Sequence, residues 1–158
     1  MNNKILDYSS VQKVIYRKVR RNIAWAEYDQ QWIPFNKRID FVLNRLKQIP
    51  FSRLKLIITF WEEYEVIQKI LRRNDISNYS LIRNYKRGRT TPGIMEIYFD
   101  DCFDENLIRT FIKKHYGYEL GKADSLNIDM VFIFKNENDV TVCHLYDDRG
   151  FQIFYLNR

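Results

Sequence analysis

The C-terminal part of the sequence places the strongest constraint on the fold. Three runs rich in β-branched and aromatic residues, near "MVFIFKN", "VTVCHLY" and "FQIFYLN", are joined by the short segments "NEND" and "DDRG". Connections of this length, built from Asn, Asp and Gly, are typical of hairpin turns between antiparallel strands. We therefore expect residues 130–157 to form three consecutive antiparallel strands of one sheet.

The upstream sequence adds further strands. The run "LKLIITFW" (54–61) is continuously apolar, has strand length and a β-branched centre, and so predicts a buried strand. Residues 78–101 contain two strand-like stretches around a loop, because the segment from Lys86 to Gly93 holds two glycines and a proline. The stretch 23–32 can hold one more short extended segment.

Helices are expected between these strands. Apolar residues recur at three- and four-residue spacing in segments 9–25, 36–50 and 104–117. Segment 62–74 has its glutamates first and its Lys and Arg residues last, which matches the helix dipole at both ends. Asn36 and Asp104 suit N-cap positions, Pro50 stops the second helix, and Gly117 fits the left-handed position just past the last one.

Together these elements predict a single α+β domain over residues 1–158. We expect an antiparallel sheet of about five strands with three to four packing helices, the helices lying mainly in the N-terminal half. A chain of 158 residues can bury about two-thirds of the surface that it exposes when unfolded. The hydrophobic content of 46% and the aromatic content of 16% likewise favour a packed core over disorder.

Composition also bears on the compartment. No apolar run approaches the roughly 20 residues that span a bilayer. The start of the chain, "MNNKILDYSS", lacks the basic-then-apolar order of a signal peptide. Cys102 and Cys143 have no metal-like spacing and are expected to be reduced. These features predict a cytoplasmic protein with no membrane partner.

The tail also carries a resemblance. "VCHLYDDRGFQIF" resembles the C-terminal signature of an uncharacterised bacterial domain-of-unknown-function family that is common in Firmicutes. Members end in a strand, a Tyr-Asp-Asp-Arg-Gly turn and a final strand, and the matching residues here are 146–150. The apolar helix running into "LKLIITFWEE" is similar in pattern. The resemblance implies one folding unit and a bacterial or phage origin, without an activity to transfer.

The turn itself has two interpretations. As a hairpin corner, Gly150 supplies a backbone angle that other residues reach at a cost, Asp147 accepts bonds from amides two residues on, and Arg149 pairs with an aspartate or a neighbouring strand. As a site, Asp147 and Asp148 project together at the sheet edge and bind a divalent cation or a basic patch of a partner. The protein- or ion-binding candidates of this region are Asp147, Asp148, Arg149 and His144.

A second acidic cluster raises the possibility of a metal-dependent nuclease. Its members are Glu96, Asp100, Asp101, Asp104 and Glu105. Carboxylates at the end of a strand can bind magnesium for phosphodiester chemistry. One nuclease pattern also needs an acid two residues before a strand lysine, and this chain has Ile133 there, before Lys135. Helix capping by Asp104 and ordinary solvation explain the cluster more simply.

Charge is unevenly distributed along the chain. Residues 1–93 hold 19 basic and 8 acidic residues, a net charge of +11, whereas residues 94–158 carry −5. Such asymmetry fits either an acidic partner such as nucleic acid or two complementary parts of one domain. The segments "YRKVRR" and "RNYKRGR" interleave cations with aromatic residues, as nonspecific nucleic-acid surfaces do. The nucleic-acid-binding candidates are Arg17, Lys18, Arg20, Arg21, Arg83, Lys86, Arg87 and Arg89.

No catalytic spacing, phosphate-binding loop or zinc motif accompanies these features, so no cofactor or metal is expected. The leading hypothesis is therefore a non-enzymatic protein-interaction module of bacterial or phage origin, of the immunity, antitoxin or anti-defence type. Its expected partner is another protein, such as a toxin or defence component. The alternatives are a nucleic-acid-binding accessory protein and, third, a metal-dependent nuclease. The sequence leaves the oligomeric state open.

Overall fold

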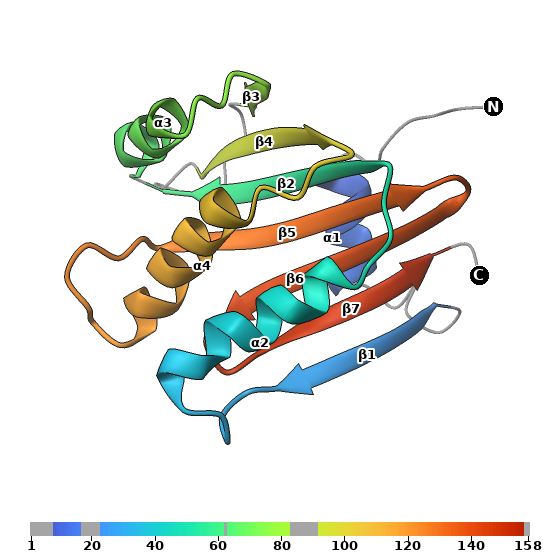
Figure 1. Ribbon diagram of the computed structural model, residues 1–158, viewed down its shortest axis with the longest axis horizontal. Helices are drawn as coiled ribbons and strands as arrows, with labels where there is room; N and C mark the ends of the chain where they lie inside the picture. Colours follow the sequence, from blue (N-terminus) through green and yellow to red (C-terminus); the bar gives the residue numbers. More distant parts are fainter. Residues whose placement is uncertain (1–7, 17–22, 62, 83–91, 157–158) are drawn as a thin grey trace.

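The computed structural model describes residues 8–16, 23–61, 63–82 and 92–156, which form seven strands and four helices (Figure 1). The strands are β1 (Ala24–Asp29), β2 (Arg53–Phe60), β3 (Tyr79–Ile82), β4 (Gly93–Asp100), β5 (Ile128–Asn136), β6 (Asp139–Asp147) and β7 (Gly150–Leu156). The helices are α1 (Tyr8–Tyr16), α2 (Phe35–Lys47), α3 (Tyr64–Arg73) and α4 (Glu105–Glu119).

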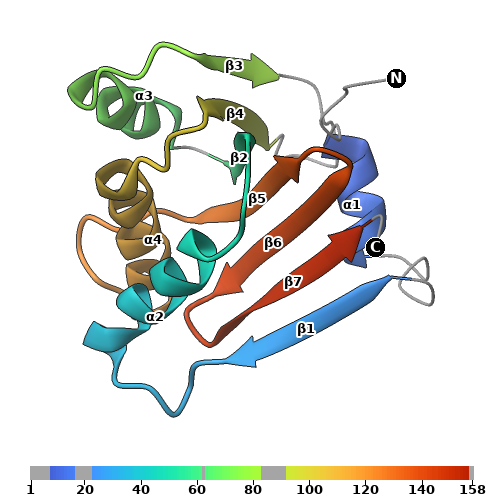
Figure 2. The same ribbon diagram turned by 45° about the vertical axis from the view of Figure 1, so that its right-hand side comes forward.

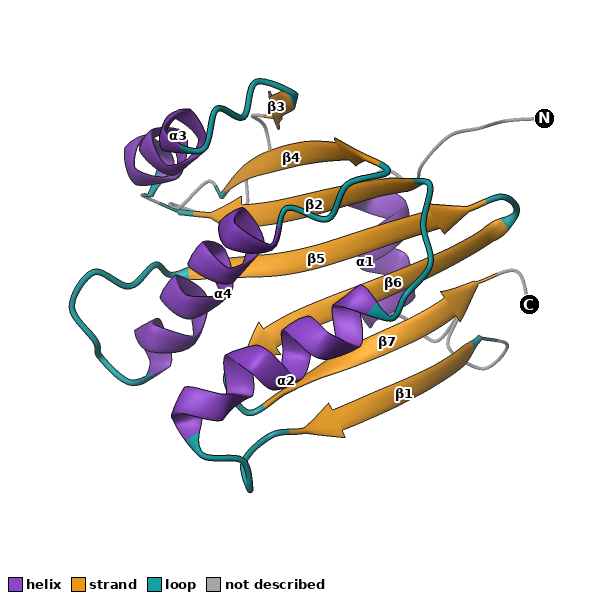
Figure 3. Cartoon of the chain, in the orientation of Figure 1, coloured by secondary structure: helices purple, strands orange, loops and turns teal. Residues whose placement is uncertain are grey.

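All the strands belong to one antiparallel sheet with the order β1-β7-β6-β5-β2-β4-β3. The predicted run of three C-terminal strands is confirmed as the β5–β6–β7 meander, and the α+β class is confirmed with it. Two parts of the prediction are wrong. The sheet has seven strands rather than about five. The helices spread along the chain, since α4 follows β4 and precedes β5 in the sequence (Figure 3 colours helices and strands differently).

The error lies in the total and not in the segments, because the two edge strands β1 and β3 fall within the extended stretches expected at 23–32 and 78–101. Residues in both strands are partly buried or exposed, as is typical of edge strands, which are short and polar on one side. The central strand β2 is the opposite case. It pairs with β4 and β5 and is buried on both faces from Leu54 to Phe60, which explains its continuous apolar run.

Helices cover both faces of the sheet. α2, α3 and α4 lie on one face, where Leu56 and Ile58 of β2 join the main core, and α1 lies on the other (Figures 1 and 2). α1 buries Val11, Val14 and Ile15 against the second face, as its apolar stripe predicts. Among the described residues, no helix has the length and apolar character needed to cross a membrane.

The helix ends agree only partly with the sequence. Asp104 caps α4 as expected, because its side chain accepts a hydrogen bond of 3.1 Å from the Leu107 amide. Asn36 is not a cap, since α2 begins at Phe35 behind Pro34. The predicted role of Gly117 is also wrong. α4 continues to Glu119, and the left-handed residue is Gly121, with φ of 61°.

Candidate functional site

The β6–β7 turn holds its two aspartates in separate contacts within the chain. The carboxylate of Asp148 lies 2.5 Å from the guanidinium of Arg38 on α2. Asp147 pairs with the guanidinium of Arg149, whose Nε donates to it over 2.7 Å, and accepts the Arg149 amide over 2.8 Å. Both aspartates are buried, and the Arg149 side chain is exposed. Each carboxylate is therefore paired with an arginine of the same chain, and the two do not face solvent together.

Arg38 also ties this turn to the connection between β1 and α2. Its Nε donates to the Ile33 carbonyl over 2.9 Å, and its Nη2 donates to the Gln31 carbonyl over 3.2 Å. The Gln30 amide donates to the Arg149 carbonyl over 2.6 Å. Hydrogen bonds with the turn and with Arg38 thus hold Gln30, Gln31 and Ile33 in position. These contacts favour the interpretation of the turn as a structural hairpin corner.

The predicted reason for Gly150 is wrong. Gly121 is the glycine with positive φ among the described residues, so Gly150 does not adopt the special backbone angle. Instead, a Cβ on Gly150 would lie 2.4 Å from the Tyr146 hydroxyl and 2.6 Å from the Tyr28 carbonyl oxygen. Glycine is required here because another backbone approaches closely.

His144 lies apart from the turn aspartates, on the face of the sheet that carries α1. Its Nε2 is 2.7 Å from the Asp129 carboxylate, and its ring meets Tyr146 edge to face at 6.0 Å. The Tyr146 hydroxyl donates to Glu27 over 3.1 Å. Burial first, and then this carboxylate, raise the pKa of Tyr146 to about 12. The structure therefore separates His144 from the other three candidates of its group.

Three of the five members of the acidic cluster make structural contacts, and the other two, Asp100 and Asp101, are exposed at the end of β4. Glu96 is buried beside the Lys55 ammonium at 3.5 Å and accepts the Tyr98 hydroxyl at 2.5 Å. Burial and then the Glu96 hydrogen bond raise the pKa of Tyr98. Asp104 caps α4, and Glu105 lies 2.5 Å from Lys47. Within the described ranges, no group of three or more His, Cys, Asp or Glu side chains is placed to hold a metal ion.

The predicted nucleic-acid-binding residues lie outside the described residues. They are Arg17, Lys18, Arg20, Arg21, Arg83, Lys86, Arg87 and Arg89.

Three exposed apolar side chains at one end of the molecule have no recognisable signal in the sequence. Trp32 is 75% exposed in the β1–α2 connection, and Tyr118 and Leu120 at the end of α4 are 45% and 49% exposed. The start of α2, the end of α4 and the β6–β7 turn gather at the same end of the fold (Figure 1, lower left). We call residues 30–34, 118–122 and 147–150 the loop end.

Direct contacts hold the segments of the loop end together. The buried Gln30 side chain donates a hydrogen bond of 2.9 Å to the hydroxyl of Tyr116 in the last turns of α4. Asp147 first, and then Asp148 and Glu119, raise the pKa of the Arg149 guanidinium, so the end of α4 lies within electrostatic range of the β6–β7 turn. The exposed side chains of the loop end therefore project from a fixed frame.

Two hollows border the helices. The α2–α4 groove, of about 730 Å³, opens on the outer side of these helices, beside the loop of residues 122–125. Its lining includes Phe35, Ile39, Arg109, Lys113, Lys114 and Lys122.

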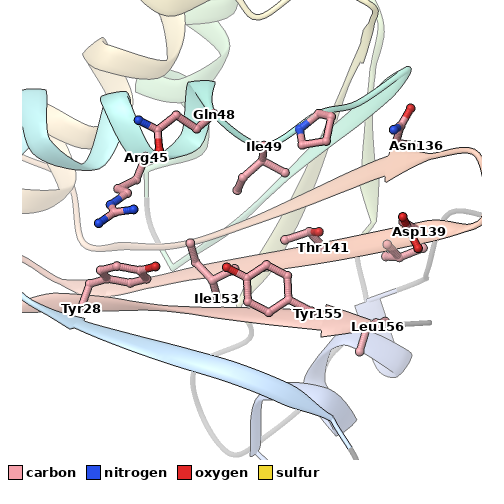
Figure 4. Close-up of a pocket in the computed structure, with 12 residues that line it drawn as sticks. Tyr28, Arg45, Gln48, Ile49, Asn136, Asp139, Thr141, Ile153, Tyr155 and Leu156 are labelled. Carbon is pink, nitrogen blue, oxygen red and sulfur yellow. The ribbon is translucent and has the colours of Figure 1, made fainter. Parts of the chain in front are cut away.

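The second hollow, of about 220 Å³, lies between the end of α2 and strands β1, β6 and β7 (Figure 4). The Arg45 guanidinium sits 4.8 Å from the Tyr28 ring centre at its edge, and Ile153 and Tyr155 form part of its apolar wall (Figure 4). Its lining contains no histidine, cysteine or serine. Its polar lining residues, among them Asp139, Thr141 and Tyr155, can form hydrogen bonds with a bound molecule.

No protein-family model, curated protein or solved structure matches this chain. The resemblance of residues 146–150 to a bacterial family therefore stays a prediction, and function has to be inferred from the residues and their geometry.

Proposed function

We propose that the chain is a non-enzymatic protein-interaction module that docks its partner through the loop end. The observation that carries the proposal is the exposure of Trp32, Tyr118 and Leu120 on one end of the fold. Exposed aromatic side chains of this kind suit a module of the immunity, antitoxin or anti-defence type, of bacterial or phage origin. Its partner would be a toxin or a component of a defence system.

The side chains suit such a role energetically. Tryptophan and tyrosine are enriched among the few residues that dominate binding energy at protein interfaces. A large aromatic side chain buries roughly 150–250 Å² at about 25 cal/mol per Å². Covering the exposed three-quarters of Trp32 would therefore contribute roughly 3–5 kcal/mol before ordering costs. One such anchor accounts for a substantial share of a micromolar affinity.

The frame behind Trp32 also supports the proposal. Arg38 and Gln30 hold both flanks of the tryptophan through hydrogen bonds to the backbone of Gln31, Ile33 and Arg149. A loop that is already ordered loses less conformational entropy when it binds. The hydrogen bonds with the β6–β7 turn and Arg38 would thus serve binding indirectly, because they position the loop that carries Trp32.

The test uses the tagged full-length protein in a lysate of the cells that encode it, with and without nuclease and at low and high salt. The captured protein is identified, purified and titrated against the wild type, Trp32→Ala and Trp61→Ala. Trp61 is a matched control, because it is 40% exposed but lies between β2 and α3. We expect Trp32→Ala to weaken binding at least tenfold and Trp61→Ala to leave it unchanged.

Two results would overturn the proposal. Equal affinity of the wild type and Trp32→Ala for the purified partner would remove the loop end as the docking surface. Captured nucleic acid that disappears with nuclease or at high salt would favour the alternative of a nucleic-acid-binding accessory protein, because phosphate contacts weaken steeply with ionic strength.

A further inference from the structure

We infer that the α2–α4 groove binds an acidic segment of the partner protein, one that carries apolar side chains between its carboxylates. The inference rests on the proposed function and names the partner's chemistry. The groove adjoins the loop end along the chain. Phe35 follows Trp32 by three residues, and Lys122 follows Leu120 by two. A segment that covers Trp32 and Leu120 can therefore continue into the groove.

Among the described residues, two of the positive charges around the groove are already compensated by ion pairs. Arg109 is paired with Asp40 at 2.7 Å and with Glu105 at 3.1 Å, and Lys114 is paired with Asp124 at 3.0 Å.

Lys113 and Lys122 are different. Within the described part of the chain, neither forms an ion pair, and both line the groove as exposed residues. Two ammonium groups in one cavity repel each other, and a carboxylate between them relieves that repulsion. The charge pattern therefore favours an anionic occupant.

The walls of the groove specify more than charge. The Lys122 ammonium lies 4.0 Å from the centre of the Phe35 ring, a cation–π contact that holds the charge over an aromatic surface. Ile39 and Ala123 add apolar wall beside it. Apolar surface next to free cations matches a chain that presents both carboxylates and apolar side chains.

A polypeptide fits this surface better than a nucleic acid does. A phosphate backbone carries closely spaced charges and is normally met by a continuous track of cations. Here Lys113 and Lys122 are accompanied by the carboxylate of Asp124 in the groove lining and by that of Asp40, which pairs with Arg109. These carboxylates are 88% and 61% exposed and would repel successive phosphates. A peptide can place single carboxylates at the two lysines and leave the acidic positions to neutral residues.

The experiment measures fluorescence anisotropy of labelled probes with the purified full-length protein. The acidic probe is the peptide Ser-Glu-Leu-Ser-Glu-Phe-Ser, which carries single carboxylates between apolar and neutral residues, its neutral match has Gln at every Glu, and a thymidine oligonucleotide of equal charge is the third probe. The double variant Lys113→Glu/Lys122→Glu is compared with Lys69→Glu/Arg72→Glu. The second pair is exposed on α3 and makes the same change in net charge away from the groove.

We expect saturable binding of the acidic peptide that weakens at least tenfold in the groove variant, with little change in the α3 variant and no binding of the Gln peptide. No binding of the acidic peptide, or equal loss in both double variants, would overturn the inference. Binding of the oligonucleotide in preference to the peptide would overturn it in favour of nucleic acid.

The proposed function can fail separately from the groove. A partner that binds the wild type and the groove variant equally, but binds Trp32→Ala weakly, refutes only the groove. A partner that is indifferent to Trp32→Ala refutes the loop end, whatever the peptide does.

Discussion

The pairing of Asp148 with Arg38 gives the sharpest prediction, because it decides whether the β6–β7 turn is structural. Asp148→Ala removes a carboxylate 2.5 Å from the guanidinium, at a place where the two side chains are 15% (Arg38) and 8% (Asp148) exposed. Deleting one partner of a fully buried ion pair costs about 3–5 kcal/mol. In the variant, Arg38 still donates hydrogen bonds to the carbonyls of Ile33 and Gln31, so the loss is smaller. We expect the free energy of unfolding to fall by about 2–3 kcal/mol.

Thermal unfolding followed by circular dichroism measures this loss. For a chain of this size, 1 kcal/mol shifts Tm by about 2–4 °C, so Asp148→Ala should lower Tm by roughly 5–10 °C. Asp40→Ala is the control, because it breaks an ion pair with Arg109 in which the carboxylate is 61% exposed, and its Tm should change much less. Arg38→Ala/Asp148→Ala should lose less than the sum of the single variants, because neither charge is then left alone. An unchanged Tm in Asp148→Ala would refute the structural role of the turn and restore this carboxylate as a partner-binding group.

Three further predictions concern the buried framework. Burial lowers the pKa of His115 in the folded chain, so the unfolded chain takes up a proton first as the pH falls below its pKa of about 6.5, and the folded state loses stability. Urea titrations should therefore show a free energy of unfolding that declines from pH 7 to 5. His115→Leu should flatten that decline. Gly150→Ala should cost about 1–3 kcal/mol in chemical unfolding, because the new Cβ meets the Tyr28 carbonyl, and a neutral effect would contradict the close approach. Tyr116→Phe removes the buried acceptor of Gln30 and should cost about 1–3 kcal/mol in the same assay, whereas full stability would show that the contact is dispensable.

The sequence predicted the elements whose signals are local. The β5–β6–β7 meander follows from strand runs joined by short turns, and β2 follows from an apolar run that fits only the centre of a sheet. Asp104 is recognisable as a cap because capping needs a side chain just three residues from its amide. Such features depend on neighbours in the chain, so they can be inferred without the fold.

The candidate site depends on contacts that local patterns do not contain. Arg38 and Asp148 are 110 residues apart, and nothing near either one indicates the other. Lys55 and Glu96 are buried, although charged residues are usually exposed, because they meet across β2 and β4. Trp32 would be expected in the core from its hydrophobicity, and only its polar neighbours in "YDQQW" hinted at a loop.

Hydrogen–deuterium exchange of the chain, with and without its purified partner, tests the central claim most directly. The account predicts that the partner slows exchange at the amides of residues 30–32, 118–122 and the adjoining groove residues, and leaves α3 and β3 unchanged. Protection centred instead on residues 17–22 or 83–91, with the loop end exchanging as fast as in the free chain, would contradict it.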